Sequence, residues 1–92
     1  MEFIKSEAGS LESSDCFINI EPSEKFIIEI TSTVDKQFHD SILLDIEKIV
    51  ERFKSSYNID NLPIKIKVDD RGALPFALRA RALTALNRSL KR

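Results

Sequence analysis

The residues able to do chemistry are few, and most lie near the start of the chain. A serine-rich run, Ala8-Gly9-Ser10-Leu11-Glu12-Ser13-Ser14-Asp15, offers hydroxyl groups beside carboxylates, and Cys16 follows it directly. His39 is the only histidine. Nucleophilic catalysis by a hydroxyl or thiol needs a base that a third group orients. One histidine without a serine-elbow motif does not supply that arrangement, so we expect no catalytic residues and no enzyme activity from this chain alone.

The cysteine and histidine counts bear on metal and redox chemistry. One Cys16 cannot form an internal disulfide, and one cysteine with one histidine cannot build a Cys/His zinc site, so we expect no metal. No cationic neighbour in the sequence lowers the pKa of Cys16, and we expect a buried, inert thiol. We expect His39 to sit at the boundary of a helix's apolar face with one ring nitrogen reaching solvent.

Composition narrows the class of protein. The chain has 92 residues, 42% of them apolar and 32% charged, which suits one globular domain. Two glycines are too few for a glycine-rich nucleotide-binding loop. No stretch approaches 18 apolar residues, and the first residues lack the apolar core of a secretory signal, so we expect a cytoplasmic protein with no membrane partner.

Charge is distributed unevenly along the chain. Residues 1–70 hold all 15 acidic residues, whereas residues 71–92 hold six of the 14 basic residues and no acid. Those six are spaced through an apolar pattern and are not grouped with aromatic residues. We therefore predict a helix with a solvated basic face and no nucleic-acid partner.

Three segments alternate as strands do. Cys16, Ile18 and Ile20 share one face of the segment 16–21, and the turn around Pro22 leads to a second strand over 25–31. The short connection predicts an antiparallel hairpin. Residues 62–68 form a third strand, whose partner, the first or the second strand, stays open.

Two segments have helical periodicity. We predict a helix that opens at Ser32-Thr33, with Asp35 in its first turn, and runs to about residue 53 or 54. A second helix is predicted over 73–90, with Pro75 in its first turn. The predicted core positions of the two helices are Phe38, Ile42, Ile46, Ile49, Val50, Phe53, Leu74, Leu78, Ala82 and Ala85, widened by Phe76, Leu83, Leu86 and Leu90.

The predicted fold is α+β, in the order ββαβα: a three-stranded sheet, made of a β-hairpin plus one strand, covered on one face by two helices. Residues 1–15 have no apolar period and are predicted to be a flexible serine-containing arm, with 16–92 forming a single domain. Arg79 falls within the apolar arc of the last helix. It must extend its head to water, pair with Asp69 or Asp70, or face a partner.

Asp40-Ser41-Ile42 is similar to the Asp-Ser-Leu/Ile signature of phosphopantetheine carrier proteins. In that family the serine begins a helix of an all-helical bundle. Here we expect Ser41 about two turns inside a helix that follows two strands. We therefore predict a serine on a polar helix face.

The serine-rich run, continuing into Cys16-Phe17-Ile18-Asn19-Ile20, resembles the attachment motif of the citrate lyase acyl carrier protein, the gamma subunit of that enzyme. That family has Gly-Ser/Thr-Leu-Glu-Ser-small-Asp just before its first strand, with glycine also occurring at the small position, here Ser14. Further matches keep the register over nearly the whole chain: Val34-Asp35-Lys36-Gln37-Phe38, Val68-Asp69-Asp70-Arg71-Gly72-Ala73-Leu74 and Leu78-Arg79-Ala80-Arg81.

The resemblance implies an acyl carrier that serves citrate fermentation in the cytoplasm. It implies a covalent prosthetic group, 2'-(5''-phosphoribosyl)-3'-dephospho-CoA, joined through a phosphodiester to Ser13, which makes the chain a phosphoprotein. The implied partners are the alpha (transferase) and beta (lyase) subunits of citrate lyase and a prosthetic-group transferase. The carrier shuttles acetyl and citryl thioesters between the two subunits, which convert citrate to oxaloacetate and acetate. Glu12 and Asp15 flank the serine and are expected to help a transferase recognise it.

Two other functions fit the sequence. One is an α+β adaptor without a prosthetic group, which has no reason to carry the run from Leu11 to Asp15. The other is the acyl carrier of malonate decarboxylase, which shares the chemistry of the arm. That family looks more like Gly-Ser-Gly-Asp at its serine, so Leu11-Glu12-Ser13 favours citrate lyase.

Overall fold

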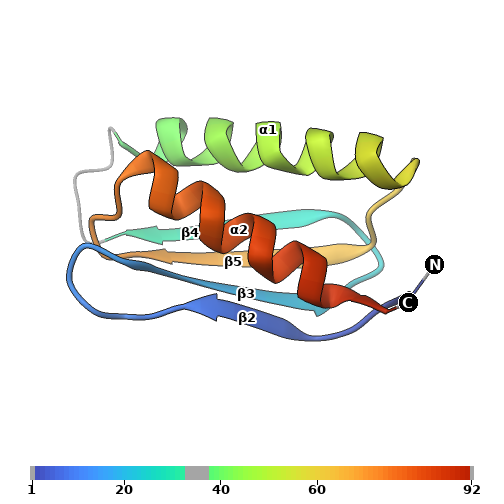
Figure 1. Ribbon diagram of the computed structural model, residues 1–92, viewed down its shortest axis with the longest axis horizontal. Coiled ribbons are helices and arrows are strands. Elements are labelled where there is room, and N and C mark those ends of the chain that lie inside the picture. Colours follow the sequence, from blue (N-terminus) through green and yellow to red (C-terminus); the bar gives the residue numbers. More distant parts are fainter. Residues whose placement is uncertain (1, 33–37, 92) are drawn as a thin grey trace.

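The computed structural model describes residues 2–32 and 38–91 and shows an α+β fold of two layers (Figure 1). One layer is a four-stranded sheet of β2 (Ser6–Gly9), β3 (Cys16–Pro22), β4 (Ile27–Ser32) and β5 (Ile64–Asp70), and the other holds α1 (His39–Tyr57) and α2 (Pro75–Ser89). Two short strands, β1 (Glu2–Phe3) and β6 (Leu90–Lys91), pair near the chain ends. Neither helix is long and apolar enough to cross a membrane.

The sheet has the order β2-β3-β5-β4, which corrects the prediction in two respects. The sheet has four strands and not three, because Ser6–Gly9 pairs antiparallel with β3 from within the expected arm. The expected hairpin between β3 and β4 is also wrong, because β5 lies between them, antiparallel to β3 and parallel to β4. The strand after the first helix therefore pairs with both earlier strands. The domain boundary at residue 15 stays a prediction.

The charges on the strands favour the position of β5 between β3 and β4. On the open face of the sheet, Lys65 contacts Glu29 of β4 at 2.9 Å and Lys67 lies 3.8 Å from Glu21 of β3. A direct β3–β4 pair would place acidic side chains on neighbouring strands, where like charges repel. With β5 between them, each acid has a lysine neighbour.

The core lies between the sheet and the helices. Ile18, Ile20, Ile64 and Ile66 are at most 2% exposed, as the alternation predicted. The core residues that the two helices contribute are Ile42, Ile46, Ile49, Val50, Phe53, Leu78, Ala82, Ala85 and Leu86. The prediction of burial is wrong for four residues. Phe38, Leu74, Phe76 and Leu83 are between 48% and 66% exposed.

The first helix begins later and ends later than expected. Ser32 closes β4 and donates its hydroxyl to Asp70, so it does not cap a helix; Thr33 and Asp35 lie outside the described residues. The helix ends at Tyr57 because Asn58 adopts the left-handed conformation, with φ +55°. The amide of the next residue, Ile59, then donates to the carbonyl of Lys54, a common way for a helix to end.

The second helix begins at Pro75, in the first turn where the sequence placed it, and ends at Ser89. It packs over β2 and β3, whereas α1 packs beside β4 and against α2. The hydroxyl of Tyr57 donates to the side-chain carbonyl of Asn87 at 2.9 Å and links the two helices.

The topology gathers several segments at one end of the molecule. The β2–β3 connection, the ends of β4 and β5, and the starts of both helices lie at the left of Figure 1. The chain ends lie at the opposite end, where the amide of Ile4 donates to the carbonyl of Ser89. The serine-rich run is thus placed beside the two later motifs that resemble the carrier family.

Candidate functional site: the serine loop

The serine loop, residues 10–15, connects β2 to β3, and Ser13 lies at its tip. The amide of Asp15 donates to the carbonyl of Glu12 at 3.2 Å, which closes a tight turn with Ser13 and Ser14 at its centre. Ser14 has φ +65°, whereas the φ of Ser13 is negative, the pattern of a type II turn. Both serines are exposed, and the Ser13 hydroxyl makes no hydrogen bond to any described residue.

Asp15 is the centre of the hydrogen bonds that hold this loop. Its side chain accepts from the Ser10 hydroxyl and from the Cys16 amide, both at 2.7 Å. Arg81 of α2 donates from Nε and Nη2 to the two carboxylate oxygens at 3.2 and 3.3 Å. Hydrogen bonds from Ser10 and Cys16, with the nearby Arg81 guanidinium, lower the pKa of Asp15.

The turn after β5 supports the other side of the loop. The amide of Ser14 donates to the carbonyl of Arg71 at 2.8 Å, and the amide of Arg71 donates to the carbonyl of Asp15 at 2.9 Å. The Arg71 guanidinium pairs with Asp69, and Asp70 accepts from the Ala73 amide. The base of the serine loop is therefore fixed, while its tip at Ser13 projects into solvent.

This arrangement shows what the loop can do chemically. Asp15 already accepts four hydrogen bonds, and its lowered pKa makes it a weak base, so it does not activate Ser13 as a nucleophile. An exposed hydroxyl on a fixed base is instead suited to accept a group from another protein. Asp15 was expected to serve recognition, and the structure gives it a part in holding the loop. Glu12 is exposed at the surface.

Gly9 allows β2 and β3 to approach each other closely at the entry to the loop. Its φ is +92°, and a Cβ atom at this position would overlap the carbonyl oxygen of Cys16. That oxygen accepts the Ser10 amide at 3.1 Å. A side chain at position 9 would therefore separate β2 from β3 where the loop begins.

Replacing Gly9 by alanine is expected to lower the free energy of unfolding by more than the same change at Gly72. Gly72 has φ +88° but open space around its Cβ position, so alanine there adds backbone strain of roughly 1–2 kcal/mol and no overlap. Urea denaturation of both variants measures the difference. Equal losses would contradict the close approach at Gly9.

The other candidate residues lie apart from this loop. Cys16 is fully buried at the start of β3, as predicted, and burial together with Asp15 and Asp70 raises its pKa to about 11. His39 is partly buried at the start of α1, and its Nε2 is shielded without a hydrogen-bond partner among the described residues. Neither ring nor thiol is hydrogen-bonded to the serine loop through its side chain.

We expect Cys16 not to react with a thiol reagent at pH 8 in the folded protein. A pKa of about 11 leaves roughly one thiolate in a thousand at that pH, and the sulfur is shielded from solvent. Ellman's reagent added to native and to urea-unfolded protein measures this. Rapid labelling of the native protein at the rate of the unfolded one would show that the thiol is accessible.

Ser41 occupies a different position from the one predicted. Because α1 begins at His39, Ser41 lies in the first turn of the helix and not two turns inside it. It is exposed, as predicted, and borders a shallow hollow with Asp45 and Asp70. Helix position alone therefore does not distinguish it from the serine of a helical carrier, but the α+β fold does.

The sequence left three alternatives for Arg79: extending to water, pairing with Asp69 or Asp70, or facing a partner. The structure does not show the pairing with Asp69 or Asp70. Arg71 pairs with Asp69, and Asp70 accepts from Ser32 and Ala73. Arg79 is exposed beside α1 and makes no ion pair with the described residues. The arginine of α2 that reaches the serine loop is Arg81, the last residue of the segment Leu78-Arg79-Ala80-Arg81.

Comparison with known proteins finds relatives that match most of this chain. A protein from Halothermothrix orenii is 39% identical over 87 residues, covering 94% of this chain and 86% of its own length. One from Haemophilus ducreyi is 43% identical over 82 residues, covering 89% and 80%, and one from Treponema denticola is 35% identical over 88 residues, covering 94% of both. All three are named citrate lyase acyl carrier protein.

The chain belongs to the citrate lyase acyl carrier protein family. A family model described as malonate decarboxylase delta subunit (MdcD) also matches residues 5–89. This match includes the serine loop, the turn at Arg71 and the ion pair between Arg81 and Asp15. Among the described residues, the serine loop is thus in direct contact with Arg71 and with Arg81, which come from two later segments of the resemblance.

Proposed function

We propose that this chain is the acyl carrier subunit of a citrate lyase and that its prosthetic group, 2'-(5''-phosphoribosyl)-3'-dephospho-CoA, is attached to Ser13. The observation that carries the proposal is the exposed Ser13 hydroxyl at the tip of a turn whose base is fixed. Attachment through a phosphodiester replaces only the hydroxyl proton of Ser13. Because that hydroxyl makes no hydrogen bond to the described residues, attachment disrupts none of the contacts that hold the loop.

The conformation of Ser14 supports Ser13 as the attachment residue. A residue with φ near +65° favours glycine, and the family resemblance includes glycine at this position. A position that accepts glycine cannot be the one that bears the group throughout a family. Ser13 has negative φ, and its neighbour Glu12 is exposed beside it for recognition by a prosthetic-group transferase.

The residues of the chain present the group and do not react. The group, when bound, supplies a terminal thiol that holds an acyl group as a thioester. The fixed base of the loop keeps the attachment point outside the core, so the transferase and lyase subunits can each reach it. Tethering raises the effective concentration of the acyl group at both active sites. On this proposal the carrier works in the cytoplasm, within the lyase complex.

Reassembly of the complex tests this function. Citrate cleavage by the transferase and lyase subunits should require the modified carrier, and the unmodified chain should not restore it. Equal cleavage with modified and unmodified chains would favour an adaptor without a prosthetic group. The unmodified chain is the matched control, because it has the same surface and lacks only the arm.

The malonate decarboxylase carrier is a second candidate, because the matching family model bears that description. The relatives at 35–43% identity bear the citrate lyase name, and Leu11-Glu12-Ser13 resembles the citrate lyase motif. Supplying the modified carrier to the other subunits of citrate lyase and, separately, to those of malonate decarboxylase distinguishes the two functions. Malonate decarboxylation with no citrate cleavage would overturn the assignment to citrate lyase.

A further inference from the structure

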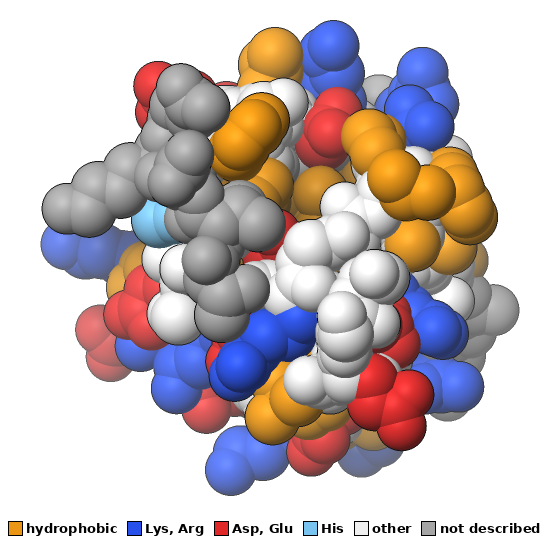
Figure 2. All heavy atoms as spheres, turned by 90° about the vertical axis from the view of Figure 1, so that its left-hand side faces the viewer, with side chains coloured by type: hydrophobic (Ala, Val, Ile, Leu, Met, Phe, Trp, Pro, Cys, Tyr) orange, Lys and Arg blue, Asp and Glu red, His pale blue; other side chains and the backbone are white. Residues whose placement is uncertain are grey.

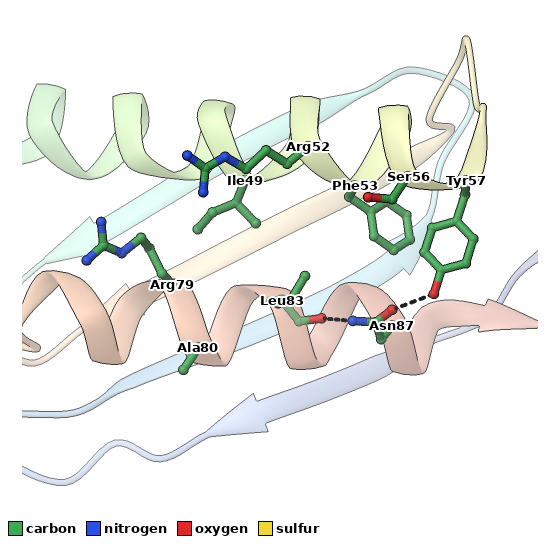
Figure 3. A pocket seen from close by; sticks show the side chains of 9 residues that line it. All are labelled: Ile49, Arg52, Phe53, Ser56, Tyr57, Arg79, Ala80, Leu83 and Asn87. Carbon is green, nitrogen blue, oxygen red and sulfur yellow. Dashed lines mark hydrogen bonds between the residues drawn. The ribbon is translucent and has the colours of Figure 1, made fainter.

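A groove of about 600 Å³ lies between α1 and α2 (Figure 3). Its apolar lining comes from Ile49 and Phe53 of α1 and from Leu83 of α2. Leu83 is 48% exposed although its neighbours Ala82 and Leu86 are buried. Leu83 is only partly covered within the isolated chain, so complete burial of its side chain requires a partner.

Two arginines border the same groove. Arg52 comes from α1 and Arg79 from α2, and in Figure 3 both side chains extend toward the start of their helices. Neither makes an ion pair with residues 2–32 or 38–91. Other basic groups after residue 70 do have partners: Arg71 with Asp69, Arg81 with Asp15, Lys91 with Glu2, and Arg88 with the carbonyl of Glu7.

The exposed apolar surface continues along α2 beyond the groove. Phe76, Ala80 and Leu83 are spaced four and three residues apart, so they form one stripe on the helix, and all three are exposed. Phe76 is 66% exposed in the first turn of α2. Figure 2, which views the serine-loop end of the molecule, shows apolar side chains at the surface among basic and acidic ones.

We propose that the groove and the stripe bind an amphipathic acidic segment of a protein partner. Its apolar side chains would cover Leu83 and Phe76, and its carboxylates would pair with Arg52 and Arg79. Charge complementarity selects this occupant, because two unpaired guanidinium groups beside an apolar surface match carboxylates beside apolar side chains. The inference rests on the proposed function in one respect: the partner is a subunit of citrate lyase.

The same features disfavour other occupants. A small anion would satisfy the arginines and leave Phe76 and Leu83 in water. A second copy of this chain, docked by a two-fold axis through the groove, would bring each pair of arginines toward the same pair on its mate. Like charges in such an interface repel, so self-association does not satisfy this surface.

The location of the surface suits a carrier. Phe76 lies in the first turn of α2, five residues after Arg71, whose backbone is hydrogen-bonded to the serine loop. A partner seated along α2 therefore lies close to the attachment turn. Docking would hold that partner beside the arm through contacts that do not involve Ser13.

Binding of the unmodified carrier to the isolated alpha and beta subunits of citrate lyase tests this surface. We expect Arg79→Ala, Arg52→Ala and Leu83→Ser each to weaken binding to at least one subunit by tenfold or more in isothermal titration calorimetry, as buried interface anchors do. Lys48→Ala is the matched control, because it removes one positive charge from the exposed surface of α1 outside the groove and should bind as the wild type does. Thermal denaturation verifies that each variant is folded.

Three results would overturn the proposal that the groove and the stripe bind an acidic segment of a partner. Folded variants that all keep wild-type affinity would exclude the groove. A wild-type dimer that Leu83→Ser dissociates would show a second copy as the occupant, and citrate-induced NMR shifts confined to Arg52 and Arg79 would show a small-anion site. These failures leave the proposed function standing, whereas a wild-type chain that binds neither subunit would reject both.

Discussion

Replacing Ser13 by alanine is expected to abolish citrate cleavage in the reassembled complex. Without the hydroxyl there is no atom to which the arm can be joined, so the loss should be complete. The variant should still fold, because the side chain is exposed and makes no hydrogen bond to the described residues. Surface changes of this kind typically alter stability by at most about 0.5 kcal/mol. Cleavage assays and urea denaturation measure the two effects separately.

Ser14→Gly is the matched control at the neighbouring position. Glycine accepts the positive φ of residue 14 and keeps the amide that donates to Arg71, so the loop should keep its shape. This variant should be modified and should support cleavage. Loss of activity in Ser14→Gly together with full activity in Ser13→Ala would show that the prosthetic group is attached to Ser14 and not to Ser13.

Replacing Ile46 by alanine is expected to lower the free energy of unfolding by roughly 2–5 kcal/mol. The side chain is 1% exposed between α1 and the sheet, and its removal leaves a cavity that the surrounding core fills only in part. Leu83→Ala is the control, because Leu83 was predicted to be buried and is in fact 48% exposed. It should change stability by about 0.5 kcal/mol. Equal losses in urea denaturation would contradict the different burial of the two residues.

Strand and helix positions could be predicted where side-chain periodicity determines burial. Ile18 and Ile20, like Ile64 and Ile66, alternate with polar residues and point into the core as expected. The buried face of α1 follows the spacing from Ile42 to Phe53. Periodicity predicted burial of Leu83 and Phe76 wrongly. Both lie at the margin of the apolar arc of α2, and Leu78, Ala82 and Leu86 already fill the core beneath that helix.

The strand β2 could not be predicted from its own sequence. Ser6-Glu7-Ala8-Gly9 has no apolar alternation, and its conformation is set by pairing with β3. Burial of Ser6 is made possible by α2, because the Ser6 hydroxyl donates to the carbonyl of Ala85 at 2.7 Å. A contact across 79 residues leaves no local pattern in the sequence.

Side-chain periodicity also could not predict the order of the strands in the sheet, although the charges on the strands favour the observed order. A short connection usually joins neighbouring strands, which favoured a hairpin of β3 and β4. The alternation of lysines on β5 with acids on β3 and β4 favoured the observed order instead. For the serine loop, the motif made Ser13 the candidate, which stays a prediction, and the hydrogen bonds from Arg71 and Arg81 to the loop could be found only from the fold.

The most direct test of the attachment to Ser13 is the mass of the chain after coexpression with the enzymes that make and attach the prosthetic group. We predict a gain of one group, with the modified tryptic peptide spanning residues 6–25 and fragmentation between Ser13 and Ser14 assigning it to Ser13. A chain that gains no mass would contradict the carrier function. A modified residue at Ser14 or Ser41 would contradict the site.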